Sequence, residues 1–208
     1  MCGADLSGIE LRMLAHYLAR YDGGRYADIL LNGDIHQVNA DKIGISRRAV
    51  KTVTYAFLYG ASATRIGTSY DKQLSPNKAA AKGKEIRDAF IKAIPGLSEL
   101  LSAVKKRSAT GKILAIDGRT LLVDSPHKAL NFLLQGSAAT IAKKWLQITH
   151  DNKPPTAHQL AFVHDELQYE CKEEDHIDLL FLLELAAAEA GEYYNLRIPI
   201  AAEAKAGA

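Results

Sequence analysis

One stretch, residues 157–171, limits the folds open to this chain more than any other, because two strand-like runs enclose a charged core. Residues 160–163 are apolar, and Leu167 and Tyr169 alternate with polar residues. This pattern around His164-Asp165-Glu166 predicts a β-hairpin with two adjacent carboxylates at its tip. Carboxylates are costly there unless they are solvated, paired or bound to a cation. The tip is therefore either a solvated turn or half of a divalent-metal site.

A further acid, Asp5, lies at the end of a short strand predicted at residues 2–6. From Ile9 an apolar stripe of helical period begins, with Ser7 as its N-cap and Glu10 as the capping-box partner. Asp5 thus sits at a strand end immediately before a helix, and such junctions often carry catalytic groups.

Residues 47–59 are predicted to form a helix that is capped by Ser46 and ended by Gly60. Two cations and then two aromatics recur along it at four-residue spacing: Arg47, Lys51, Tyr55 and Tyr59. This spacing keeps them on one face over about 18 Å. The face suits a nucleoside triphosphate, with phosphates at the cationic end near the helix N-terminus. The alternative is an amphipathic helix whose tyrosines are in the core and whose cations are in water.

The remaining segments are assigned from periodicity and turn signals. The expected elements are an irregular region at 62–75, helices at 77–107 (broken by Pro95-Gly96), from Ser125-Pro126 and at 174–190, a hairpin at 112–123 turning at Asp117-Gly118-Arg119, and a strand at 196–201. Asn131 and Gln135 lie one turn apart on a polar face, where they either contact groove-edge acceptors of a duplex or are simply exposed.

Composition leaves the function open. The 208 residues carry a net charge of only +2, but basic residues gather in the middle of the chain and acidic ones late. This distribution indicates either a polyanion-binding middle or solvated helix faces. Cys2 and Cys171 form no metal-type spacing and no disulfide framework, which favours a reducing cytoplasm. No apolar run reaches membrane-spanning length, so no membrane partner is expected.

Four segments, in this order, resemble the motifs of family A DNA polymerases. Asp5 to Arg12 (DLSGIELR) resembles the first palm motif, and Arg47 to Gly60 (RRAVKTVTYAFLYG) resembles the fingers helix. Asn131 to Ala139 is similar to the duplex-contacting helix, and Val163 to Glu166 (VHDE) is similar to the second palm motif. The resemblance covers nearly the whole chain and is closest to phage replicative members.

The resemblance implies an α+β fold, in which an antiparallel-sheet palm carries an inserted, mostly helical fingers subdomain. The palm would comprise residues 1–33 and 126–208, and the fingers residues 34–125. It also implies template-directed addition of deoxynucleotides to a primer 3′ hydroxyl, with primer-template DNA and deoxynucleoside triphosphates as partners. A bacterial cell or a phage-infected host cell is the implied setting.

The same resemblance implies roles for individual residues. Asp5, Asp165 and the backbone carbonyl of Leu6 would hold two Mg²⁺ ions, with Glu166 as an auxiliary carboxylate. Lys51 would be catalytic as a proton donor to pyrophosphate. The implied nucleotide-binding residues are Glu10, His36, Arg47, Lys51, Tyr55 and Tyr59, and the implied DNA-binding residues are Arg12, Arg119, Asn131, Gln135 and His164.

Some positions depart from the family pattern. Ala56 replaces the usual glycine, so the fingers helix is expected to pack differently there, and Gly8 replaces a commoner polar residue. His127 stands where bacterial members carry arginine. Tyr55, rather than phenylalanine, is the phage-like choice and predicts poor discrimination against dideoxynucleotides.

Compared with the family, the thumb and the exonuclease are expected to be absent from this chain, and the chain alone is expected to bind primer-template weakly, because phosphate contacts supply most of that affinity. A separate chain carrying these parts is one expected partner. Two alternatives to an active polymerase core stay open. The first is a protein without activity of its own, either a remnant that binds nucleotide or DNA or one subunit of a split polymerase. The second is a two-metal nuclease.

Overall fold

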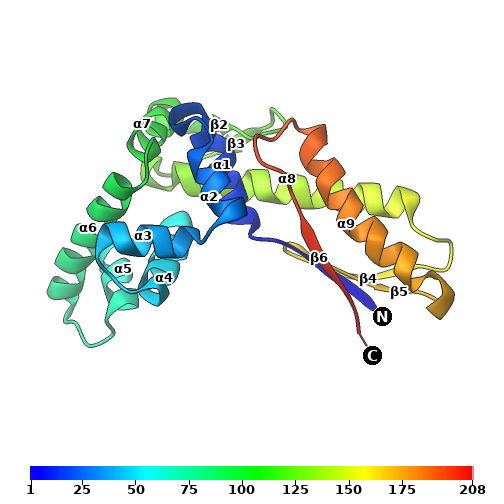
Figure 1. Ribbon diagram of the computed structural model, residues 1–208. Coiled ribbons are helices and arrows are strands. Elements are labelled where there is room, and N and C mark those ends of the chain that lie inside the picture. Colours follow the sequence, from blue (N-terminus) through cyan, green and yellow to red (C-terminus); the bar gives the residue numbers. More distant parts are fainter. Residues whose placement is uncertain (208) are drawn as a thin grey trace. The chain divides into compact units, whose positions relative to one another are not determined.

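The computed structural model describes residues 1–207 and has an α+β architecture (Figure 1). The helices are α1 (Ile9–Asp22), α2 (Arg25–Asn32), α3 (Ile35–Ile43), α4 (Arg47–Leu58), α5 (Ala63–Tyr70), α6 (Pro76–Ala93), α7 (Leu97–Arg107), α8 (Ala129–Asn152) and α9 (His176–Tyr193). The strands are β1 (Cys2–Leu6), β2 (Lys112–Leu114), β3 (Thr120–Leu122), β4 (His158–Val163), β5 (Glu166–Glu170) and β6 (Ala202–Ala206). The chain forms two compact units. We call residues 1–13, 115–119 and 135–208 the sheet unit, and residues 14–114 and 120–134 the helical unit.

The sheet unit is built on a four-stranded antiparallel sheet of order β4-β5-β1-β6. Along β1, Cys2, Ala4 and Leu6 are buried, and Gly3 and Asp5 alternate with them. Because side chains of a strand alternate between faces, one face of β1 is apolar and the other carries the acid. Helix α9 contacts β1 and β6 beside the sheet (Figure 1).

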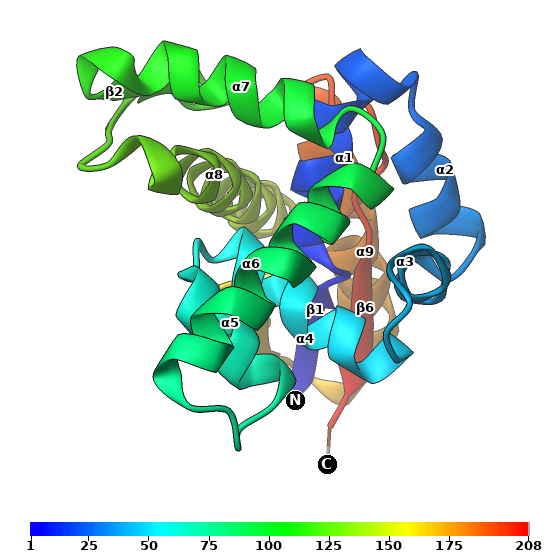
Figure 2. The same cartoon turned by 90° about the vertical axis from the view of Figure 1, so that its left-hand side faces the viewer.

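In the helical unit, α5 and α6 lie side by side (Figure 2), and their backbones approach each other closely at two glycines. A Cβ atom added at Gly83 would lie 1.7 Å from the carbonyl oxygen of Ala63, and one added at Gly67 would lie 1.9 Å from that of Ala79. Both glycines therefore permit backbone contact between the helices. A buried cluster of Val53, Ile66 and Ile86 joins these helices to α4, and Ala56 packs against that cluster.

Most predicted elements are confirmed. The 157–171 segment is a hairpin of β4 and β5, residues 112–123 form the β2-β3 hairpin, and the long helical region divides at Pro95-Gly96 into α6 and α7. No helix among residues 1–207 is long and apolar enough to cross a membrane.

Two predictions are wrong. Residues 63–70, expected to be irregular, form α5, because Ser62 caps the helix and the buried Ile66 packs onto its neighbours. The last strand lies at Ala202–Ala206 rather than at 196–201. Residues 196–201 include Pro199, which cannot donate a ladder hydrogen bond. Ile198 and Ile200 are instead buried side chains of the connection before β6.

Candidate functional site

Asp5 and Asp165 are neighbours in the sheet unit although they are far apart in the sequence. The Leu6 N–H donates to the carbonyl oxygen of Asp165 at 3.0 Å, and Asp5 lies opposite Glu166 in the β1-β5 ladder. Asp165 belongs to the two-residue turn between β4 and β5, where His164 has the left-handed φ of 58°. This conformation is uncommon for a residue other than glycine. The hairpin tip and the end of β1 thus form one acidic cluster.

The acids of this cluster disfavour one another's ionisation. The pKa of Asp5 is raised by burial first and then by the charges of Asp165 and Glu166. Burial also raises the pKa of Asp165, and the Glu10 carboxylate adds to this effect, while a backbone hydrogen bond and His164 oppose it. Like charges brought together in this way are stabilised by a bound cation.

The donor set fits Mg²⁺. Carboxylate and carbonyl oxygens are its preferred protein ligands, and it is commonly held by one or two carboxylates together with water and substrate phosphates. Asp5 and Asp165 are two such carboxylates, and Leu6 is tied to Asp165 through its backbone. Glu166 accepts a hydrogen bond from the Gln168 side chain. Among residues 1–207, no group of three or more His, Cys, Asp or Glu side chains is placed to hold a metal ion.

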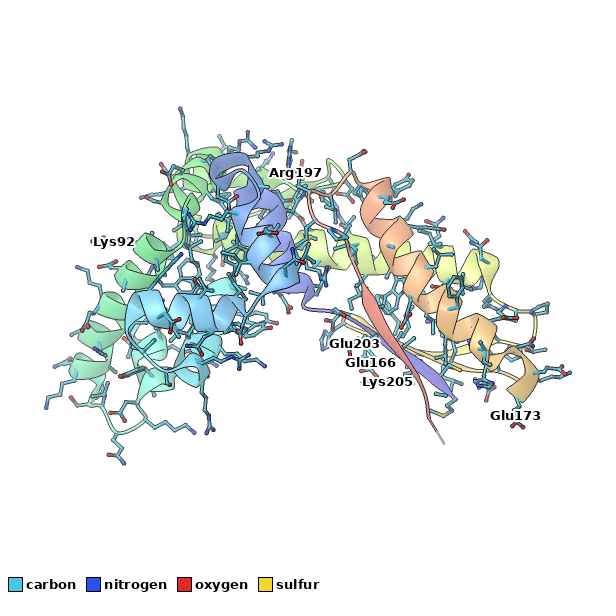
Figure 3. The ribbon with its side chains drawn as sticks, viewed as in Figure 1. Lys92, Glu166, Glu173, Arg197, Glu203 and Lys205 are labelled. Atoms are coloured by element: carbon cyan, nitrogen blue, oxygen red, sulfur yellow. The ribbon has the colours of Figure 1, made fainter. Side chains whose placement is uncertain are left out.

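Glu203, which the sequence did not single out, belongs to the same row of acids. It lies opposite Asp5 in the β1-β6 ladder, and its charge also raises the Asp5 pKa. Figure 3 shows Glu203, Glu166 and Lys205 along the sheet, and these residues line an open hollow with Asp5 and Gln168. No local signal marks Glu203, because its position depends on the pairing of β6 with β1.

In the helical unit, α4 begins as predicted. The Ser46 hydroxyl accepts a hydrogen bond from the Ala49 N–H at 3.2 Å, and Gly60, with φ 71°, follows the C-cap. Arg47 and Lys51 are exposed, Tyr55 is half-buried and Tyr59 is 54% exposed. The exposure of Tyr59 rules out the alternative in which both tyrosines belong to the core.

His36 and Asp34 lie beside the cationic end of α4. The His36 ring is buried and lies 6.3 Å from the Tyr55 ring, centroid to centroid. Burial lowers the pKa of His36, and the charges of Arg47 and Lys51 lower it further. The Nδ1 atom of His36 has no hydrogen-bond partner among the described residues. A buried polar atom of this kind calls for a partner, and a phosphate oxygen would supply one.

Asp34, which was not singled out from the sequence, accepts a hydrogen bond from Arg47 Nε at 2.7 Å. The same carboxylate caps α3 by accepting from the backbone N–H groups of His36 and Gln37. Its position just before a helix is an N-cap signal that reveals the capping role. The contact with α4 has no such signal.

The residues expected to contact DNA have contacts within their own units. In the sheet unit, Arg12 donates from Nε to the Ser7 carbonyl oxygen at 2.6 Å and from Nη1 to that of Pro199 at 2.5 Å. In the helical unit, Asn131 Nδ2 donates to the Leu58 carbonyl oxygen at 2.9 Å. Both side chains are partly exposed, so internal contacts occupy only some of their polar atoms.

Three other predicted DNA contacts lie in the sheet unit. Arg119 pairs with Asp117 at 3.0 Å and donates to the Thr140 hydroxyl. The Nε2 atom of Gln135 is buried, and no described residue accepts a hydrogen bond from it. His164 is exposed at the hairpin turn.

The family model for DNA polymerase family A matches residues 1–208. The DNA-directed DNA polymerases of Enterobacteria phage T3 and Escherichia phage T7 are each 32% identical over 99% of this chain. The chain spans about a third of their length, 32% in each case.

A solved structure has a similar fold. It is the POL domain of Pol1 from M. smegmatis, in complex with DNA primer-template and dNTP. The likeness has a TM-score of 0.79 at 24% identity and covers 99% of this chain and 39% of that one. The family match over the whole chain and the two phage relatives establish that this chain belongs to DNA polymerase family A.

Proposed function

We propose that the chain is a template-directed DNA polymerase core that transfers a deoxynucleoside monophosphate to a primer 3′ hydroxyl. The observation that carries this proposal is the adjacency of Asp5 and Asp165, fixed by the hydrogen bond from Leu6 N–H to the Asp165 carbonyl oxygen. Family membership supplies the reaction class, since the named relatives are DNA-directed DNA polymerases.

Within this proposal, residues 1–33 and 126–208 form the palm and residues 34–125 the fingers. Asp5, Asp165 and the Leu6 carbonyl would hold two Mg²⁺ ions. Bound there, Mg²⁺ would lower the pKa of the primer hydroxyl and neutralise charge on the triphosphate. Glu166 would be an auxiliary carboxylate of the metal site, and Glu10 would lie beneath the incoming sugar, where its carboxylate helps exclude a 2′ hydroxyl.

The helical unit would bind the nucleotide. Arg47 and His36 would contact the phosphates, and Lys51 would also donate a proton to the leaving pyrophosphate. Tyr55 would pack against the sugar and base. Tyr59, at the end of α4, would occupy the template-base position until the fingers close.

DNA contacts complete the proposal. Arg12, Arg119, Asn131, Gln135 and His164 would lie along the primer-template near the primer end. Arg12, Asn131 and Gln135 would reach the minor groove, where acceptors occur at similar places in every base pair, so they would test pair shape rather than sequence. His164 would touch the primer terminus. The reaction would take place in the cytoplasm of a bacterial or phage-infected cell, and a separate chain that carries the thumb would be a partner.

Primer extension tests the proposal directly. The full chain is incubated with primer-template, Mg²⁺ and all four deoxynucleotides, with and without a supplied thumb fragment. We expect primer lengthening that Asp165→Asn abolishes. The matched control is Glu170→Gln, which removes an exposed carboxylate at the far end of β5, the strand that follows Asp165, and is expected to extend the primer normally.

Other outcomes separate the alternatives. Nucleotide binding without extension, even with the thumb fragment, would identify a binding remnant or an inactive subunit. Shortening of the labelled strand would identify a nuclease. Extension that persists in Asp165→Asn would contradict the assignment of the acidic cluster.

A further inference from the structure

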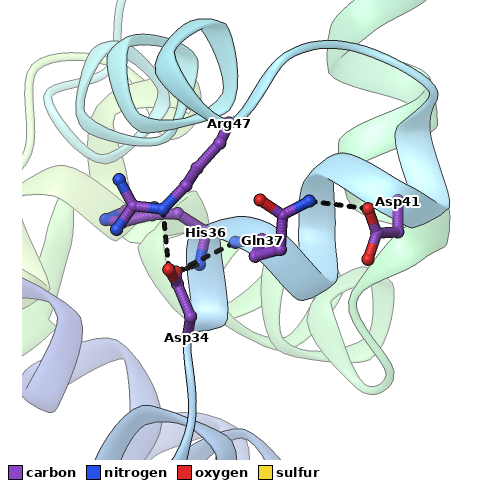
Figure 4. A network of polar contacts seen from close by, with 5 residues as sticks. All are labelled: Asp34, His36, Gln37, Asp41 and Arg47. Carbon is purple, nitrogen blue, oxygen red and sulfur yellow. Dashed lines mark hydrogen bonds and ion pairs between the residues drawn. The ribbon is translucent and has the colours of Figure 1, made fainter.

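Asp34 joins the start of α3 to the start of α4 through one carboxylate (Figure 4). Its Oδ1 accepts hydrogen bonds from the backbone N–H of His36 at 3.1 Å and of Gln37 at 3.0 Å. Its Oδ2 accepts from Arg47 Nε at 2.7 Å. Both oxygens are therefore used, and the two backbone bonds fix the orientation of the carboxylate on the helix end.

This contact leaves the phosphate-binding end of Arg47 available. A guanidinium carries five N–H donors in a planar fork, and Asp34 engages Nε. The two terminal nitrogens are the ones suited to bidentate contact with phosphate oxygens. Asp34 thus holds the guanidinium by its inner edge and does not cover its outer edge.

The pair contributes little to fold stability, because Arg47 and Asp34 are 51% and 46% exposed and ion pairs in water are weak. Its main physical effect is on the arginine side chain, which loses rotamer freedom when it is fixed. If Asp34 has already restricted Arg47, a ligand that binds Arg47 no longer bears that entropic cost.

The same carboxylate also positions a second residue next to α4. Its bond to the His36 backbone fixes the first turn of α3, where the buried His36 ring faces Tyr55. One aspartate thereby holds the guanidinium of Arg47 and the backbone of the residue that carries the imidazole on α3.

We propose that Asp34 is a positioning residue that presents the guanidinium of Arg47 to the triphosphate of the incoming nucleotide. This inference rests on the proposed function, because it assumes that Arg47 binds phosphate. The alternative is that Asp34 competes with the phosphates for Arg47, in which case its removal would tighten binding. The two roles therefore predict opposite changes in nucleotide affinity when the Asp34 carboxylate is removed.

A double-mutant cycle on the full chain tests the proposal. Asp34→Asn keeps an oxygen that can cap α3 but removes the charge that holds Arg47. The affinities for Mg²⁺-dATP and for tripolyphosphate are measured in wild type, Asp34→Asn, Arg47→Ala and the double variant. We expect Asp34→Asn to lower the affinity for both ligands by about fivefold to tenfold, a usual coupling between two residues in direct contact. In the Arg47→Ala background it should have no further effect.

The control is Asp41→Asn, since Asp41 is an exposed carboxylate of α3 that bonds the Gln37 side chain and not Arg47. It is expected to bind both ligands as wild type does. If Asp34→Asn weakens binding equally with and without Arg47, the effect comes from the α3 cap and the positioning role is wrong. Tighter or unchanged binding in Asp34→Asn would overturn it too.

The results also distinguish this inference from the proposed function. If Arg47→Ala weakens binding and Asp34→Asn does not, only the role of Asp34 is wrong. If wild type binds neither ligand, or Arg47→Ala has no effect, the nucleotide site on α4 is wrong and the role of Asp34 is wrong with it.

Discussion

The Asn131 side chain donates a hydrogen bond to the Leu58 carbonyl oxygen at 2.9 Å, which ties α8 to the last turn of α4. Carbonyls in the last turn of a helix have no partner within that helix, so the amide satisfies an otherwise unpaired acceptor. Asn131 therefore stabilises the end of the helix that carries Arg47 and Lys51, in addition to any contact with DNA.

Removing the Asn131 amide is expected to lower the stability of the protein even when no DNA is bound. Asn131→Ala leaves the Leu58 carbonyl unpaired, which costs about 1 kcal/mol, or about 2–4 °C in Tm. Thermal unfolding measures the change. The control Asn152→Ala removes a similar side-chain-to-carbonyl bond from the exposed end of α8 and should leave Tm within about 1 °C. Equal Tm values for Asn131→Ala and wild type would contradict the structural role.

The crossing of α5 and α6 depends on glycine. In Gly83→Ala, the new methyl group would meet the Ala63 carbonyl oxygen, so the helices must separate. We expect a loss of about 3 kcal/mol, the upper end of the usual cost of overpacking, despite the better helix propensity of alanine. Urea unfolding measures it. Ala81→Ser, at an exposed position of α6, is the control. If Gly83→Ala is about as stable as wild type, the two helices are farther apart than this close contact requires.

Local sequence signals predicted helix α4 of the helical unit better than strand β6 of the sheet unit. Helix α4 was predicted from its cap at Ser46, its four-residue spacing and the stop at Gly60, all of which lie within the segment itself. Strand β6 was missed, because Ala202–Ala206 consists of alanine, glutamate and lysine, which are depleted in strands. Its pairing with β1 and its contact with α9 decide its structure instead.

The candidate site divides in the same way. Asp5 and Asp165 were identified because each stands beside a recognisable strand end. Glu203 and the pairing of Asp34 with Arg47 were not, because each depends on contacts between distant segments. Sequence spacing fixes which residues share a helix face, but it does not fix the register of strands or the approach of one helix end to another.

The buried His36 is expected to make stability depend on pH. Its folded-state pKa lies below the unfolded value of about 6.5, chiefly because of burial. The unfolded state then binds more protons between the two values, so stability falls as pH decreases through about 6.5 and levels off below the folded pKa. The Tm of wild type relative to His36→Gln should therefore decrease from pH 8 to pH 5. A pH-independent difference would contradict a neutral, buried imidazole.

Tyr55 is expected to control selection of the sugar. If its hydroxyl substitutes for the missing 3′ hydroxyl of a dideoxynucleotide, Tyr55→Phe should increase discrimination against dideoxynucleotides at least tenfold, about the value of one hydrogen bond. Competition between a deoxynucleotide and its dideoxy analogue in primer extension measures the ratio. Tyr21→Phe, at an exposed tyrosine of α1 that has no role in the proposed nucleotide site, is the control and should leave the ratio unchanged. Strong rejection of dideoxynucleotides by wild type would refute this role.

Cys2 and Cys171, which lack any motif spacing, approach each other in the folded sheet unit with their sulfur atoms 3.8 Å apart. Cys2 is buried at the start of β1, and Cys171 follows β5 and is half-buried. Burial raises the pKa of the Cys2 thiol, so attack on an oxidant should begin at the more accessible Cys171.

Oxidised glutathione is expected to convert this pair into a disulfide. The Cys171 thiolate would attack the glutathione disulfide and release one glutathione, and Cys2 would then displace the second, so that two thiols are oxidised and one disulfide is reduced. Because the link closes a loop of most of the chain, Tm should rise by about 5 °C or more and return with dithiothreitol. Peptide mapping without reductant identifies the linked peptides, and Cys171→Ser should show neither the link nor the Tm rise. A stable glutathione adduct on Cys171, with Cys2 still reduced, would show that the two sulfurs cannot close to bonding distance.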